Sequence, residues 1–147
     1  MSDNQYLVIE GSAKNAEDAI NICGEVLYKA GIVGREFGKK CWIRECNYPT
    51  GLPTVIPVAI PHCKDDEIKK NAICILRLTN PVIFRRMDDD QEIIETKLII
   101  NLAIKESQNH LKILQNLMTF LNDEEQVSTC QSMSANELIV HLTKRIG

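Results

Sequence analysis

The stretch Thr96-Lys-Leu-Ile-Ile-Asn-Leu-Ala-Ile104 is apolar at almost every position after its lysine. A strand with one face in water alternates apolar and polar side chains, whereas a strand covered on both faces is almost continuously apolar. The stretch 72–78, Ala-Ile-Cys-Ile-Leu-Arg-Leu, has the same character over its first positions. We therefore expect two central strands of a sheet that helices cover on both faces.

Helical patterns flank these strands. Between positions 19 and 30 apolar residues recur every three or four positions, which is typical of one buried helical face. Asn15 suits the N-cap of that helix and Gly31 suits its end. Four more helices are expected: 35–46, 108–121, a short one opened by Asp123-Glu124, and a last one capped by Ser134 with Glu137 at the capping-box position.

Three details of this prediction concern single positions. In helix 35–46, Phe37, Cys41 and either Trp42 or Ile43 should face inward. Asn80-Pro81 should form a turn between strand 72–78 and a further short strand, 82–84. The buried stripe of helix 108–121 should contain Leu111, Ile113, Leu114, Leu117, Met118 and Leu121.

The order of these elements, which begins with a short strand at 7–9, predicts an α/β fold. A mixed β-sheet should be sandwiched by helices on both faces. The 147 residues are enough for one well-buried core, so we expect a single domain over 1–147.

The composition of the chain excludes several classes of function and location. The net charge of -3, with Lys and Arg scattered rather than clustered, argues against nucleic acid as a partner. The chain shows no signal-peptide pattern at its start and no apolar run near the ~20 residues that span a bilayer, so we expect a cytoplasmic protein. Its six cysteines include no C-x-x-C pair, so no metal is expected. No cofactor is expected either.

The segment Gly51-Leu-Pro-Thr-Val-Ile-Pro-Val-Ala-Ile-Pro-His-Cys63 carries the first candidate for chemistry. A short hairpin or edge extension should lead to Pro61, which cannot donate to a β-ladder and so ends the strand. His62 would then lie on a stiff corner at a strand end, where α/β proteins place reactive groups. An ordinary surface turn is the alternative for an isolated Pro-His pair.

Two other histidines are present. His110 should lie in the first turn of the helix that follows strand 96–104, at the carboxyl edge of the sheet. It could meet His62 there if the strand before His62 ends at the same edge; a polar first-turn residue without function is the alternative. His141 lies beside apolar residues in the last helix, and we interpret it as a partly exposed residue without function.

Several motifs together resemble a known family. They are Val-Ala-Ile-Pro-His-Cys at 58–63, Arg44-Glu45 and Pro-Thr-Gly upstream, and His110-Leu-x-x-Leu-x-x-Leu downstream. This combination is similar to enzyme IIA of the bacterial sugar phosphotransferase system, in the fructose/mannitol superfamily. The slightly longer hairpin and the cysteine after His62 are most similar to the galactitol-type branch.

The resemblance implies a function and roles for three residues. His62 corresponds to the histidine that accepts a phosphoryl group from the phosphocarrier protein HPr and passes it to a cysteine of enzyme IIB. Arg44 corresponds to the arginine that approaches the phosphate, and His110 to the neighbouring histidine at the site. The membrane component, enzyme IIC, would take part only indirectly and would select the sugar.

Two other functions remain open from the sequence. In a regulatory module, phosphorylation of His62 would control a partner protein instead of feeding transport. In a thiol or metal protein, His62-Cys63 would act with Cys41 or Cys46, although the spacing gives little support.

Apolar residues beside the site, namely Leu52, Val55 and Ile56, are expected either to form a docking rim for partners or to belong to the core.

Overall fold

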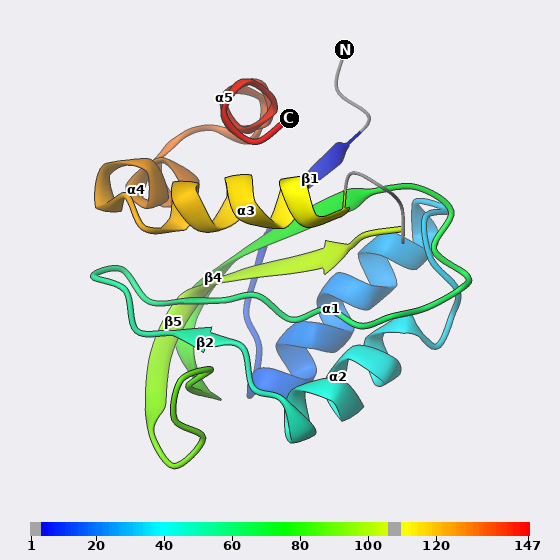
Figure 1. Ribbon diagram of the computed structural model, residues 1–147, viewed down its shortest axis with the longest axis horizontal. Coiled ribbons are helices and arrows are strands. Elements are labelled where there is room, and N and C mark those ends of the chain that lie inside the picture. The colour runs from blue at the N-terminus through cyan, green and yellow to red at the C-terminus, as the bar shows by residue number, and fades with distance from the viewer. Residues whose placement is uncertain (1–3, 106–109) are drawn as a thin grey trace.

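The computed structural model describes residues 4–105 and 110–147 (Figure 1). Its sheet has five strands in the order β1-β4-β5-β3-β2 within this part of the chain. The strands are β1 (Gln5–Gly11), β2 (Gly51–Leu52), β3 (Val58–Ala59), β4 (Ala72–Arg85) and β5 (Ile93–Ala103). β1 is parallel to β4 and β3 is parallel to β5, whereas β4–β5 and β2–β3 are antiparallel pairs. The predicted mixed sheet is therefore confirmed.

Helices cover both faces of the sheet (Figure 1). One layer contains α1 (Ala16–Lys29) and α2 (Phe37–Asn47), and the other contains α3 (His110–Leu121), α4 (Glu124–Ser132) and α5 (Ala135–Arg145). Along β5, Ile99 and Ala103 pack in the α1/α2 core, while Leu98, Ile100 and Leu102 pack in the opposite core. Alternate side chains thus enter different cores, which explains the continuous apolar run.

The predicted helix ends of α1 are confirmed. The Asn15 side chain accepts a hydrogen bond from the Asp18 N–H at 2.8 Å. At the other end Gly31 has a φ of 76°, and its N–H donates to Tyr28 O while the Ile32 N–H donates to Leu27 O. This pair of bonds is a Schellman motif, which requires the left-handed conformation that glycine adopts without strain.

Asp123 caps α4 and Ser134 caps α5, as predicted; the Ser134 hydroxyl accepts the Glu137 N–H and donates to the Glu137 carboxylate. The α3–α5 layer is also fastened to the sheet. The Arg77 guanidinium of β4 donates to the carbonyl of Met133, just beyond the end of α4.

The prediction of a turn at Asn80-Pro81 is wrong. β4 runs through both residues, and its register with β5 shifts between Arg77 and Val82. Proline lacks the N–H that a regular ladder needs, but a register irregularity leaves such a position unpaired. Pro81 is exposed there, so one bent strand replaces the two predicted short ones.

One inward-facing position was predicted wrongly, and one open alternative is decided by the structure. Leu111 is 64% exposed in the first turn of α3, whereas Phe120 is buried near its end. In α2, which begins two residues later than predicted, Ile43 is 53% exposed and Trp42 packs against the core. Trp42 is therefore the correct one of the two alternatives. None of the helices described is long and apolar enough to cross a membrane.

Candidate functional site

His62 lies just beyond the end of the sheet's edge hairpin. Ala59 of β3 pairs with Ile99 of β5, and the Leu102 N–H donates to Pro61 O at 3.0 Å. The chain therefore follows β5 as far as Pro61 and leaves it at the next residue. The predicted strand-end position of His62 is confirmed, and its side chain is half-buried.

A backbone hydrogen bond selects the tautomer of His62. Its Nδ1 lies 2.7 Å from Ile60 O. A carbonyl oxygen can only accept, so Nδ1 carries the proton and donates it. In the neutral imidazole the lone pair is then on Nε2, which makes Nε2 the nucleophilic nitrogen of this ring.

A pocket of about 130 Å³ brings His62 together with Arg44. Arg44 comes from the last turn of α2, and His62, Cys63 and Lys64 follow β3. The remaining wall is apolar and consists of Leu102, Ile104 and Leu114. Two residues that are far apart in the sequence, and that the resemblance assigned to one site, therefore line the same cavity.

Arg44 is supported on its outer side by Tyr48. Its Nη1 donates to Tyr48 O at 3.0 Å, and its Cζ lies 5.1 Å from the centroid of the Tyr48 ring. The hydrogen bond and the cation–π contact both limit the rotamers of a long side chain. A guanidinium at a helix C-terminus also interacts favourably with the helix dipole. Arg44 is thus a fixed positive charge at the pocket.

Glu45, which the sequence placed only near the end of a helix, is a buried carboxylate at 4% exposure. Its Oε2 accepts the Thr50 N–H at 2.8 Å and its Oε1 accepts the Thr50 hydroxyl at 2.7 Å. Burial raises the pKa of Glu45 above its usual value, although the bonds from Thr50 oppose that shift. This bidentate contact fixes the chain between α2 and β2.

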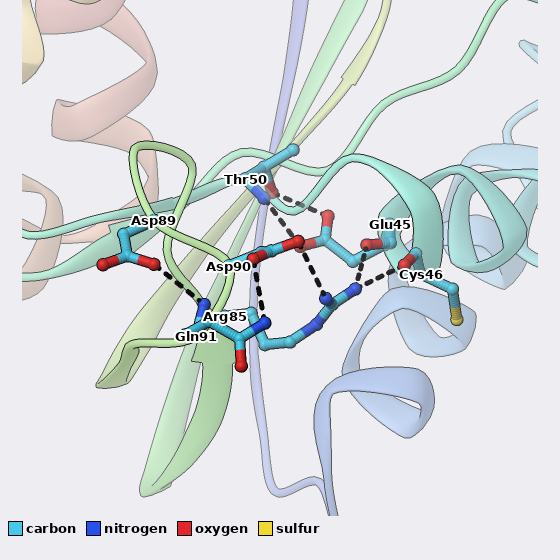
Figure 2. Close-up of polar contacts among 7 residues, drawn as sticks. All are labelled: Glu45, Cys46, Thr50, Arg85, Asp89, Asp90 and Gln91. Atoms are coloured by element: carbon cyan, nitrogen blue, oxygen red, sulfur yellow. Dashed lines mark hydrogen bonds and ion pairs between the residues drawn. The ribbon is translucent and has the colours of Figure 1, made fainter.

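The end of α2 is also attached to the long hairpin of the sheet, as Figure 2 shows. Arg85 at the end of β4 donates to the carbonyls of Glu45 and Cys46. These carbonyls belong to the last turn of the helix and have no partner within it. Together Arg85 and Glu45 hold the turn before β2 in place, and with it the hairpin that leads to His62.

The amino-terminal end of α3 borders the same pocket. β3 and β5 are parallel, so their carboxyl ends lie at one edge of the sheet, and Leu114 of α3 lines the cavity beside His62. The strand before His62 and the strand before α3 therefore end at the same edge of the sheet, which is the condition stated above for His62 and position 110 to lie close together. The side chain of His110 lies outside the described residues.

The third histidine, His141, belongs to α5. Its Nε2 lies 2.7 Å from Gln126 Oε1, and its ring packs against Phe120. Both contacts connect α5 to its neighbours in the helical layer, as expected for a structural residue.

The predicted docking residues separate into two groups. Leu52 is 7% exposed and belongs to the core, and Ile56 is half-buried against it. Val55 is 76% exposed in the hairpin that precedes His62. Leu52 therefore cannot form a rim, whereas Val55 has the exposure that a docking residue needs.

The structure brings Cys63 next to Cys41, the pairing that the sequence left open as an alternative with little support from spacing. Their Sγ atoms lie 3.5 Å apart, with Cys41 in the core and Cys63 half-buried at the pocket. Cys46 is exposed. Among residues 4–105 and 110–147, no three His, Cys, Asp or Glu side chains group as metal ligands. The two sulfurs are 22 positions apart and meet because the segment after β3 contacts α2, so no local pattern shows this contact.

The site thus places an oriented imidazole beside a guanidinium, the side chain that binds phosphate oxygens through paired hydrogen bonds. The chain belongs to the family "Phosphoenolpyruvate-dependent sugar phosphotransferase system, EIIA 2", whose model matches residues 2–145. It is therefore a phosphotransferase component of that system.

Individual relatives agree with this assignment. The chain is 33% identical over 132 residues to the galactitol-specific EIIA component of Escherichia coli K12, covering 89% of this chain and 87% of that protein. It is 27% identical over 146 residues to the mannitol-specific enzyme IIA component of Geobacillus stearothermophilus, covering 97% and 94%. The crystal structure of IIA mannitol from Escherichia coli superposes with a TM-score of 0.72 at 26% identity, covering 92% and 94%.

Proposed function

We propose that the chain acts in the cytoplasm as one EIIA domain over residues 1–147, with Nε2 of His62 as the phosphoryl acceptor. The group comes from phospho-HPr and leaves to a cysteine of an enzyme IIB that serves a membrane enzyme IIC. The proposed sugar is galactitol or a similar polyol, on the strength of the galactitol-specific relative. The observation that carries the proposal is the Nδ1 bond of His62 to Ile60 O, beside Arg44 in one pocket.

The first step replaces one phosphorus–nitrogen bond by another. Nε2 of His62 attacks the phosphorus as the bond to the HPr histidine breaks, and no proton has to leave Nε2. The Ile60 carbonyl accepts from Nδ1–H, so it stabilises the positive charge that the ring gains during the attack. The phosphoramidate remains a reactive donor for the thiolate of enzyme IIB.

Arg44 would neutralise the equatorial oxygens of the transferred group. Phosphoryl transfer depends on positioning and on charge stabilisation, and a guanidinium can donate two parallel hydrogen bonds to phosphate oxygens. The pocket volume of about 130 Å³ is many times the ~10–15 Å³ that one water needs, so the pocket has room for a phosphoryl group. For His110 we propose a contact to the phosphate or to His62.

The test is phosphorylation with phosphoenolpyruvate, enzyme I and HPr. Wild type should form an acid-labile, alkali-stable phosphoprotein, and the phosphorus NMR spectrum should show an Nε2 adduct. His62→Ala should not be labelled, whereas the matched control His141→Ala should be labelled at the wild-type rate. Label that persists in His62→Ala, or an Nδ1 adduct, would overturn the proposal.

A second arm separates transport from regulation. Phosphorylated protein mixed with galactitol-type enzyme IIB should lose its label to an IIB cysteine. Label that stays on His62 with every IIB tested would instead support the regulatory module.

A further inference from the structure

Cys41 and Cys63 form a neighbouring pair of cysteines in which one member is accessible. Their sulfurs are 3.5 Å apart, one in the core of the α1/α2 layer and one at the His62 pocket. Cys23 and Cys74 are also neighbours, but both are 0% exposed. Only the Cys41–Cys63 pair, among the described residues, joins a buried thiol to one that small molecules can reach.

The surroundings prepare Cys63 for reaction. The pKa of Cys63 is lowered, first by the hydrogen bond from the Cys41 thiol and further by the charges of Lys40 and Arg44, against burial and Asp65. The pKa of Cys41 is raised well above its usual value by the same contact and by burial. Thiolate character at an accessible sulfur favours oxidation, and a neighbouring thiol can then resolve the product.

We propose that Cys41 and Cys63 form an intramolecular disulfide when the protein meets a hydroperoxide. The Cys63 sulfur attacks the peroxide, so that an S–O bond forms, the O–O bond breaks, and Cys63 becomes a sulfenic acid. The Cys41 sulfur then attacks the Cys63 sulfur; an S–S bond forms, the S–O bond breaks, and water leaves with the Cys41 proton. Two thiols lose two electrons in total, and hydrogen peroxide is reduced to two waters.

The geometry allows this closure with a small movement. The two sulfurs must approach from 3.5 Å to the ~2.05 Å of a disulfide. Cys63 lies in an irregular segment between β3 and β4, which can adjust more easily than a strand. That segment already contacts α2 next to Cys41, because Lys40 Nζ lies 3.1 Å from Asp65 Oδ1. The disulfide would add a covalent link beside an existing ion pair.

The disulfide should also slow phosphoryl transfer, and this consequence rests on the proposed function of His62. Closure shortens the distance between the two sulfurs by about 1.4 Å, and we expect the segment that contains Cys63 and the adjacent His62 to take up part of this movement, since Cys41 lies in a helix of the core. A misplacement of about 1 Å can cost ~100-fold in rate. We expect oxidised protein to accept the phosphoryl group at least about tenfold more slowly, and dithiothreitol to restore the rate.

The first experiment measures the disulfide alone. Reduced full-length protein is treated with hydrogen peroxide, and its thiols are then blocked and its peptides mapped by mass spectrometry. Wild type should lose two hydrogens and yield a Cys41–Cys63 cross-linked peptide. Cys46→Ser is the matched control and should form the same link. Cys63→Ser should form none, and Cys41→Ser should retain a sulfenic acid at Cys63 that dimedone traps.

These outcomes decide the inference independently of the transfer assay. No cross-link in wild type, or a link that requires Cys46, overturns the oxidation site. A cross-link that leaves the rate of labelling from phospho-HPr unchanged overturns only the effect on transfer. Label that persists in His62→Ala overturns the proposed function, while the peptide map still reports on the cysteine pair.

Discussion

Replacing Gly24 by alanine tests how closely α1 and α2 pack. A Cβ added at Gly24 would lie 2.7 Å from Gly38 Cα and 2.9 Å from Gly38 N. Ordinary contact begins at 3.4 Å, so α2 would have to move away by about 0.7 Å. The obstructing atoms belong to a helix backbone, so no side-chain rotation can relieve the contact.

The expected cost follows from two opposing effects. Overpacking a close contact costs ~1–3 kcal/mol, whereas replacing glycine by alanine inside a helix gains ~1 kcal/mol. We therefore expect Gly24→Ala to be less stable by about 1 kcal/mol, with an upper value of ~2 kcal/mol. In a chain of this size each kcal/mol lowers Tm by about 2–4 °C.

Trp42 provides the assay, because it is the single tryptophan of the chain and lies in α2, partly buried against the core. Urea unfolding followed by its fluorescence should show a lower midpoint for Gly24→Ala. Gly11→Ala is the matched control, since its added Cβ would meet only Leu76 Cδ1, at an ordinary 3.9 Å. If Gly24→Ala were as stable as wild type, α2 would be free to shift, and the reasoning about a fixed Arg44 would fail with it.

Three further predictions concern the surroundings of the site. Gly51→Ala should destabilise the protein by about 1–3 kcal/mol in thermal unfolding, because its Cβ would lie 2.6 Å from the carbonyl oxygen of Arg85; an unchanged Tm would contradict this. Glu45→Gln should change the pH dependence of stability. The pKa of Glu45 is raised in the folded protein, so protonated Glu45 adds to the free energy of unfolding. This contribution is fully present below the unfolded pKa of ~4.3 and is lost as the pH rises through the folded pKa, with a slope of at most ~1.4 kcal/mol per pH unit. In urea titrations, the free energy of unfolding of Glu45→Gln should therefore increase relative to that of wild type as the pH rises through this range. If the two free energies changed with pH in parallel, the assignment would be refuted. Val55→Asp should leave Tm unchanged but lower kcat/KM with phospho-HPr by about tenfold, equivalent to ~1.4 kcal/mol of docking energy; an unchanged rate would remove Val55 from the docking surface.

Much of the fold was predictable because its signals are local. The run after Lys97 is apolar because alternate side chains of β5 pack in the two cores. This pattern alone indicates a central strand. Caps such as Asn15 and Ser134 act within one helical turn, so their sequence patterns are reliable. Pro61 ended the strand before His62 for the same local reason.

The failures have tertiary causes. Pro81 was predicted to end a strand, but a shift in register leaves its missing N–H unpaired, and register is set by the partner strand. Glu45 is buried because Thr50 donates to both carboxylate oxygens, which depends on how the chain turns after α2. The Cys41–Cys63 contact depends on the segment after β3, which packs against that helix. None of these three features can be predicted from a short window of neighbouring residues.

The edge of the sheet that carries His62 also has a dynamic consequence. β3 is held to β5 by the Ala59–Ile99 pairing and by the bond from Leu102 N–H to Pro61 O, whereas β4 and β5 share a long ladder. Local opening free energies follow the number of bonds and contacts that must break. Amide protons around Ala59 should therefore exchange with solvent faster than those of β4 and β5. We therefore expect the segment before His62 to open locally more often than the β1-β4-β5 part of the sheet.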